Sequence, residues 1–185
     1  MPSDERAILQ ELLVLRCQRG DRNALDELVR QWEGRLFYYI RRLVATEEDA
    51  WDVLQQTWIR VFKGIKSLNT PDRLPVWLYQ LARCTTMSHW RGQYRQQAQL
   101  DTSSDLTELA APEENQSFDD AEQVHLGLSR ISPAHREILT LYFLEDLSLE
   151  QIAEVLAIPS GTVKSRLFYA KRALLAVIES EEGCP

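Results

Sequence analysis

A stretch near the C-terminal end carries the side chains that recognition of phosphates and base edges requires. Residues 160–172 contain no acid, begin with the small polar run Ser160-Gly161-Thr162, and include four basic residues: Lys164, Arg166, Lys171 and Arg172. Cations neutralise phosphates, and short polar or forked side chains hydrogen-bond to base edges in a DNA groove. A small first turn lets a helix approach the groove floor. This composition predicts a DNA-binding helix.

The elements on either side of this stretch support that prediction. Ser148 is expected to cap a short helix over residues 149–156, and the run 157–159 (AIP) is about as long as the turn of a DNA-binding helix-turn-helix. Ser160 is then expected to cap a second helix with a buried stripe of Val163, Leu167, Ala170 and Leu174. On a helical wheel the opposite side presents the candidate DNA-facing residues: Gly161, Ser165, Phe168, Tyr169 and Arg172, flanked by Thr162, Lys164 and Lys171.

Two alternatives apply to this stretch. A basic helix by itself is more often an amphipathic helix with a solvated basic side, and only the preceding capped helix and short turn favour DNA binding. Arg166 lies nearer the buried stripe than the other cations do. It has two possible roles, a structural ion pair with Glu150 or a contact with a phosphate.

The remaining candidates for chemistry do not form a catalytic or metal-binding pattern. The closely spaced acids Glu47, Glu48, Asp49 and Asp52 fall at a predicted helix start, where the helix dipole favours negative charge. The histidines stand singly, at His89, His125 and His135. The cysteines are far apart, at Cys17, Cys84 and Cys184, and are interpreted as free thiols. We therefore expect no enzymatic activity, no metal and no cofactor.

Charge is distributed unevenly along the chain. The formal net charge of −7 argues against a nucleic-acid partner, since phosphate neutralisation supplies most of the affinity for DNA. However, residues 96–129 hold eight acids and no Lys or Arg, and without these acids the net charge would be +1. No run is apolar and long enough to span a membrane, and the first residues lack the pattern of a secretory signal, so we expect a cytoplasmic protein.

Apolar residues recur at helical spacing, which predicts an all-α protein with two small helical domains joined by an acidic, flexible linker. The predicted domains are residues 1–95 and 119–185, with the linker at 96–118. Four helices are expected in the first domain, at about 4–19, 22–44, 47–65 and 75–95. Asp21 and Thr46 are the expected N-caps of the second and third. The apolar side of the first helix is expected to be Ile8, Leu9, Leu12, Leu13 and Leu15.

The C-terminal part closely resembles region 4 of the bacterial extracytoplasmic-function (ECF) sigma factors. The resemblance lies in residues 131–139 (ISPAHREIL), 149–153 (LEQIA) and 161–167 (GTVKSRL). In that family the helix-turn-helix binds the minus-35 promoter element. The resemblance implies this role for Lys164, Ser165, Tyr169 and Arg172. We expect the DNA-binding set to be completed by Ser160, Thr162, Arg166 and Lys171.

The first domain resembles region 2 of the same family in residues 49–58 (DAWDVLQQTW) and 75–83 (PVWLYQLAR). The resemblance implies that the helix around Asp52 and Gln55 docks on the β′ clamp helices of RNA polymerase. Asp49, Asp52 and Gln56 also lie at three- and four-residue spacing on one helix face, although a solvated acidic face would show the same spacing. The resemblance further implies a set of minus-10 residues: Asn69, Arg73, Arg83, His89 and Arg91.

The expected function is therefore that of a sigma factor, which directs core RNA polymerase to specific promoters and initiates transcription. The partners that the resemblance implies are core polymerase, through the β′ clamp helices and the β flap, promoter DNA, and an anti-sigma factor. Two alternatives remain: a stand-alone helix-turn-helix regulator, and a sigma mimic that sequesters an anti-sigma factor. The acidic surface around Asp52 argues against the first, and the cations of residues 160–172 argue against the second.

Overall fold

The structure is a computed structural model, and it describes residues 2–100 and 127–182. Within these ranges every regular element is helical, which confirms the predicted all-α class. The predicted linker from residue 101 onward, the expected start of the second domain, His125 and Cys184 lie outside the described residues. Among the described residues, no helix combines the length and the apolar character that crossing a bilayer requires.

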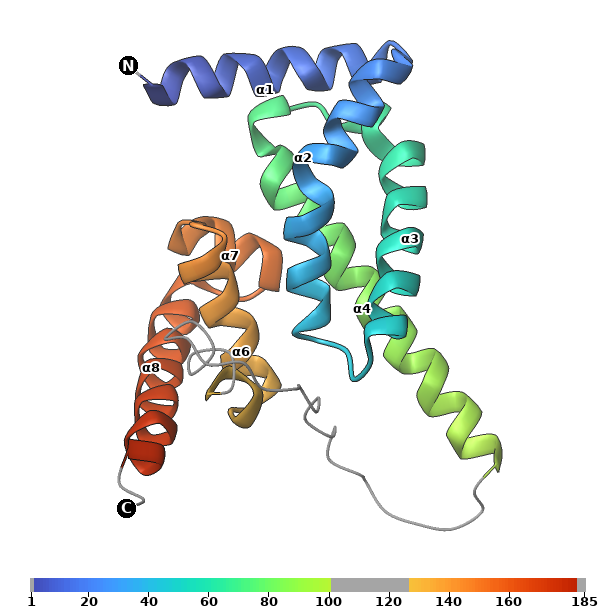
Figure 1. Ribbon diagram of the computed structural model, residues 1–185. Coiled ribbons are helices and arrows are strands. Elements are labelled where there is room, and N and C mark those ends of the chain that lie inside the picture. Colours follow the sequence, from blue (N-terminus) through green and yellow to red (C-terminus); the bar gives the residue numbers. More distant parts are fainter. Residues whose placement is uncertain (1, 101–126, 183–185) are drawn as a thin grey trace.

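Four helices form the first domain: α1 (Pro2–Gln18), α2 (Arg22–Arg41), α3 (Glu47–Gly64) and α4 (Leu74–Leu100). Two short 3-10 turns, η1 (Ile65–Ser67) and η2 (Pro71–Arg73), connect α3 to α4. Helices α2, α3 and α4 stand side by side, and α1 crosses one end of this bundle (Figure 1). The predicted N-caps are confirmed, because Asp21 accepts hydrogen bonds from the amides of Asn23 and Ala24, and Thr46 accepts one from Asp49.

The second domain contains residues 127–130, which are helical, then α6 (Pro133–Leu139), a π-helical turn η3 (Thr140–Leu144), α7 (Leu149–Leu156) and α8 (Ser160–Glu182). It packs beside α2 and α4 of the first domain (Figure 1). The buried apolar side chains of both domains belong to one cluster, whose largest fully buried members include Leu28, Leu36, Ile40, Leu54, Leu78, Ile138, Leu139 and Leu141.

The predicted apolar side of α1 is wrong for four of its five residues. Only Leu13 is buried, together with Val14 and Cys17, whereas the side chains of Ile8, Leu9, Leu12 and Leu15 are 64%, 60%, 53% and 40% exposed. Because α1 crosses the end of the bundle, it contacts the other helices along one narrow edge only. The sequence shows which residues are apolar, but it does not show the angle at which a helix crosses its neighbours.

Helix α4 ends later than predicted. It continues to Leu100, five residues beyond the expected end near Arg95, and so takes in the first residues of the predicted linker. The residues added, QQAQL, are glutamine, alanine and leucine, which all favour a helix. The polar composition of residues 96–100 is typical of a linker, but polar residues with high helix propensity can also continue a helix.

Candidate nucleic-acid interface

The helix-turn-helix forms as predicted in α7 and α8. Ser148 and Gln151 make a reciprocal capping box, in which the Ser148 amide donates to Gln151 Oε1 at 2.9 Å and the Gln151 amide donates to Ser148 Oγ at 3.2 Å. Ala157 ends α7 with a left-handed backbone (φ 53°), which turns the chain sharply into α8. Ile152 and Leu156 of α7 are buried, as are Val163, Leu167 and Ala170 of α8, whereas Leu174, the fourth residue of the predicted stripe, is only partly buried.

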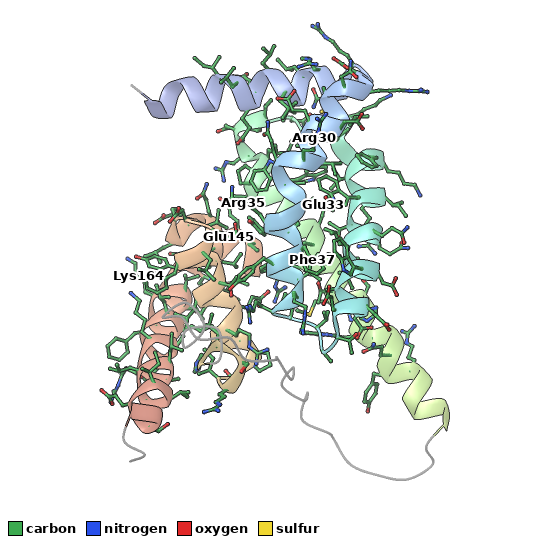
Figure 2. All side chains as sticks on the ribbon, viewed as in Figure 1. Arg30, Glu33, Arg35, Phe37, Glu145 and Lys164 are labelled. Atoms are coloured by element: carbon green, nitrogen blue, oxygen red, sulfur yellow. The ribbon has the colours of Figure 1, made fainter. Side chains whose placement is uncertain are left out.

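This packing leaves the opposite side of α8 open to solvent. The exposed residues are Ser160, Gly161, Thr162, Lys164, Ser165, Phe168, Tyr169, Lys171 and Arg172. Phe168 and Tyr169 are 57% and 59% exposed, and their rings contact each other edge to face with centroids 5.5 Å apart. Figure 2 shows Lys164 projecting from the second domain away from the first. The predicted DNA-facing residues therefore lie on one exposed side of α8, and residues 160–172 of this helix include no acid.

Three details of this surface differ from expectation or refine it. Ser160 lies in the first turn of α8 and not at its cap, because the Pro159 carbonyl already accepts the helical hydrogen bond from Val163 at 3.1 Å. Arg166 is half-buried, and among the described residues no ion pair joins it to Glu150. The Lys171 ammonium lies 5.0 Å from the ring centroids of Tyr142 and Phe143, which restrains it beside η3.

Two of the predicted minus-10 residues lie together at a groove. Asn69 and Arg73 line a groove of about 250 Å³ at the start of α4, together with Trp77 and Gln80. The second domain contributes Glu154 to the same groove, and both of its carboxylate oxygens lie within 2.7 Å of Arg73 Nη1. The Arg73 guanidinium is thus already paired with an anion in this conformation.

The other predicted minus-10 residues do not join this groove. Arg83 lies further along α4 and donates from Nε to Glu137 of the second domain at 3.0 Å. His89 faces α3, where its Nε2 lies 3.0 Å from a carboxylate oxygen of Asp49. Arg91 is exposed. Asn69 and Arg73 thus precede α4, whereas Arg83, His89 and Arg91 lie along α4 over several turns, so the five residues do not form one compact site.

The predicted polymerase-binding surface on α3 is partly as expected. Asp52, Gln55 and Gln56 are exposed on one face, but Asp49 is half-buried and accepts hydrogen bonds from Thr46, His89 and Gln93. Sequence reasoning missed two apolar residues that continue this face at helical spacing, Ile59 and Phe62, which are 40% and 43% exposed. Exposed apolar side chains beside polar ones are typical of a surface that binds another protein.

Sequence reasoning also missed a set of acids that joins the two domains. Glu137 and Glu145 of the second domain are both 5% exposed, and each faces a tyrosine of the first domain. The Tyr39 hydroxyl donates to Glu137 at 2.8 Å, and the Tyr79 hydroxyl donates to Glu145. Arg35 Nε donates to Glu145 at 2.9 Å, and Figure 2 shows these two side chains meeting between the domains.

The electrostatics of this contact follow from its burial. Burial raises the pKa of the Glu145 carboxyl above its usual value, although the hydrogen bonds from Tyr79 and Arg35 act in the opposite direction and Asp146 adds to the rise. Burial, followed by the neighbouring carboxylate, also raises the pKa values of Tyr39 and Tyr79. Both hydroxyls therefore remain protonated and available as donors to the glutamates.

Comparison with known proteins identifies the family. The chain is 31% identical over 173 residues to the RNA polymerase sigma-H factor of Pseudomonas aeruginosa, and the match covers 88% of this chain and 90% of that protein. The chain belongs to the extracytoplasmic-function (ECF) group of the sigma-70 family. Residues 28–96 match the family described as Sigma-70 region 2, and residues 127–175 match Sigma-70, region 4. The ECF RNA polymerase sigma-E factor of Haemophilus influenzae is 28% identical over 178 residues, covering 90% of this chain and 94% of that protein.

Solved structures share the fold. The sigma factor RpoE from Bartonella quintana, crystallised with the anti-sigma factor NepR, superposes with a TM-score of 0.69 at 21% identity and covers 83% of this chain and 96% of that one. CnrH, in complex with the cytosolic domain of CnrY, gives a TM-score of 0.68 at 21% identity, with coverage of 92% and 97%. Region 2 of this ECF factor thus corresponds to α2–α4, and region 4 to α6–α8.

Proposed function

We propose that this sigma factor directs core RNA polymerase to promoters through surfaces on both of its domains. In this proposal the exposed side of α8 binds the minus-35 element, the start of α4 with the groove at Asn69 and Arg73 binds the minus-10 element, and α3 binds the polymerase. Core polymerase performs the catalysis. The chain acts in the cytoplasm, where polymerase and promoter DNA are found, and it requires no cofactor or metal.

The observation that supports this proposal is that one chain carries two exposed surfaces of different chemistry. The side of α8 from Ser160 to Arg172 is cationic and free of acids, which suits DNA. The face of α3 at Asp52, Gln55, Ile59 and Phe62 combines an acid, an amide and exposed apolar groups, which suits a protein with basic helices. A stand-alone DNA-binding regulator does not require the α3 face. A sigma mimic does not require the cations of α8.

An apolar groove in the second domain supports the assignment of a polymerase contact there. Leu128, Leu139, Phe143, Leu144 and Leu174 line a groove of about 310 Å³, in which Phe143 and Leu144 are 54% and 42% exposed. The π-helical turn η3 widens the backbone at Thr140–Leu144 and carries both exposed residues. We assign the β flap of the polymerase to this groove, because apolar grooves of this kind accept an amphipathic helix from a partner.

An anti-sigma factor completes the proposed set of partners. RpoE of Bartonella quintana and CnrH, the two solved structures compared above, were each determined with a second protein, NepR and CnrY respectively. In this chain a protein inhibitor would need to cover the same apolar and acidic surfaces that we assign to the polymerase. Competition between core polymerase and the inhibitor is the expected consequence.

A pair of matched variants tests the assignment of α3. Asp52→Ala with Gln55→Ala removes an exposed acid and an exposed amide from the proposed polymerase surface. Asp26→Ala with Gln31→Ala makes the same chemical change on the exposed side of α2. Only the α3 variant should lose affinity for core polymerase, measured by co-migration on gel filtration, while both keep the helical content of the parent. Equal binding of both variants to core would refute the assignment.

A further inference from the structure

The strongest observation outside the proposed surfaces is a glutamine side chain at the end of α1. Gln18 is half-buried, and its Nε2 donates to two backbone carbonyls, that of Ile65 at 3.0 Å and that of Leu68 at 2.8 Å. The amide nitrogen carries two hydrogens, so one side-chain group supplies both bonds. Gln18 therefore joins the two ends of the segment 65–68, which contains η1 and leads from α3 toward α4.

The conformation of this segment depends on the contact with Gln18. The Ile65 carbonyl also accepts the Leu68 amide at 3.2 Å, which closes the 3-10 turn. Leu68 is 8% exposed, and within the described residues no other hydrogen bond to its carbonyl is found. Both bonds from Gln18 are partly buried, and a carbonyl that loses its partner away from water costs free energy. Gln18 thus stabilises one backbone conformation of the segment.

The end of α1 holds Gln18 in a fixed position. Cys17 beside it is 1% exposed, and its carbonyl accepts the Gly20 amide at 2.9 Å, with Gly20 in the left-handed region (φ 83°). The Arg16 guanidinium pairs at 2.9 Å with Asp21, the N-cap of α2. These contacts tie the end of α1 to the start of α2, so the Gln18 amide approaches its two carbonyls from a rigid base.

The segment that Gln18 restrains leads directly into residues assigned to the minus-10 element. Helix α1 packs against both η1 and η2 (Figure 1). Asn69 follows Leu68, is exposed, and lines the groove at the start of α4 together with Arg73. Gln18 does not line this groove. Its effect on promoter DNA is therefore exerted through the backbone that it positions.

We propose that Gln18 is a positioning residue for promoter selectivity, because its two hydrogen bonds set where Asn69 presents its side chain to the minus-10 element. This inference rests on the proposed function, since it takes Asn69 and Arg73 as minus-10 residues. Gln10 adds a longer contact to the same connection, with its Nε2 3.5 Å from the Pro71 carbonyl. Base recognition requires groups held to within about 0.5 Å, so a connection released from Gln18 distinguishes bases less well.

The test compares base discrimination by holoenzymes reconstituted from core polymerase and the full-length chain. Each holoenzyme transcribes two promoter libraries in vitro, one randomised at the minus-10 element and one randomised at the minus-35 element. The ratio of transcripts from the preferred sequence to those from its single-base variants gives the discrimination at each element. A folding defect lowers all transcripts in proportion and leaves both ratios unchanged, so the ratios report positioning and not stability.

The test variant is Gln18→Met, which keeps the length of the side chain and removes its hydrogen-bond donor. Loss of the two hydrogen bonds should lower minus-10 discrimination by about tenfold and change minus-35 discrimination by less than about twofold. Gln18→Lys keeps a donor at a similar length and should recover most of the minus-10 discrimination. The control is Gln31→Met on α2, where Gln31 is exposed and donates to Glu27 of the same helix at 3.2 Å. It should leave both ratios unchanged.

Amide hydrogen exchange of the free chain supplies a second measurement that does not depend on transcription. Exchange over residues 65–70 should be faster in Gln18→Met than in the parent, and equal exchange would count against the proposal. Unchanged minus-10 discrimination in Gln18→Met would overturn it, as would an equal loss at both elements or a loss that Gln18→Lys does not reduce. A parent chain that directs no transcription would refute the proposed function and this inference together, whereas a parent that transcribes beside an unchanged Gln18→Met refutes the inference alone.

Discussion

Lys164→Ala is the perturbation whose effect can be worked out most fully from the structure. Lys164 is exposed on the open side of α8, one turn after the start of the helix. The pKa of the Glu150 carboxyl is lowered by a backbone hydrogen bond, by the hydrogen bond from Ser148 and, to a smaller extent, by the Lys164 ammonium. The side chain does not contribute to the buried stripe of α8. The substitution should therefore leave the helix-turn-helix folded and remove one cation from its DNA-facing surface.

The magnitude follows from counterion release. Each phosphate that a protein neutralises contributes about 0.9 to the slope of log affinity against log salt concentration. If Lys164 contacts one phosphate, the variant's slope should be shallower by about 0.9. The loss of DNA affinity in Lys164→Ala relative to the parent should then shrink by a factor of about three to four between 50 mM and 200 mM salt.

The assay is binding of the reconstituted holoenzyme to a promoter fragment at several salt concentrations, with Arg22→Ala as the control. Arg22 is exposed at the first residue of α2, so its removal makes the same change in net charge far from α8. The control should keep the slope of the parent. Parallel slopes for the parent and Lys164→Ala would show that Lys164 touches no phosphate, and the assignment of the α8 surface would have to be revised.

Three further predictions follow from burial. Leu13→Ala should lower the free energy of unfolding by about 2 to 5 kcal/mol, because the Leu13 side chain is 4% exposed. Leu12→Ala should change this free energy by less than about 0.5 kcal/mol, since Leu12 is exposed. Chemical denaturation of both variants compares the two values. Iodoacetamide should modify Cys84 far faster than Cys17 in the native protein, since Cys17 is buried and burial raises the pKa of its thiol. Equal rates for the two cysteines in peptide mapping would contradict the burial of Cys17. Burial raises the pKa of the Glu145 carboxyl, so the folded protein binds this proton more tightly than the unfolded chain does. The stability that this group contributes should therefore be fully present below the ordinary glutamate range and be lost as the pH rises through the raised value. Chemical denaturation at several pH values should show this decline in the parent but not in Glu145→Gln.

Local features of the helices were predictable from the sequence because they depend on neighbouring residues. Asp21, Thr46 and Ser148 cap helices as expected, since a short acceptor side chain before an apolar repeat can reach the free amides of the first turn. The buried stripe of α8 was also predictable, because Val163, Leu167 and Ala170 recur at helical spacing.

Features that depend on how helices meet were not predictable in the same way. The apolar side of α1 depends on its crossing of the bundle, so the leucine at position 12 is exposed while that at 13 is buried. Asp49 belongs to the acidic start of α3 by spacing, yet its carboxylate is occupied by His89 of a helix 40 residues away in sequence. Neither contact has a signature in the local sequence.

The buried contact of Glu137 and Glu145 with the first domain was missed for the same reason. Glu137 and Glu145 are acids, which composition alone assigns to the surface, and their burial depends on Tyr39, Tyr79 and Arg35 of the other domain. Residues 131–139 (ISPAHREIL) place Glu137 beside His135 and Arg136, so the local sequence does not distinguish it from a solvated acid. Its burial depends on partners that the local sequence does not contain.

The most direct test of the central claim is transcription in vitro by bacterial core RNA polymerase, with and without this chain, across a library of promoter fragments. The account predicts new start sites that appear only when the chain is added and that share common elements near minus-35 and minus-10. Failure of the chain to bind core polymerase, with no new start site on any fragment, would contradict the account and leave a stand-alone DNA-binding regulator as the better description.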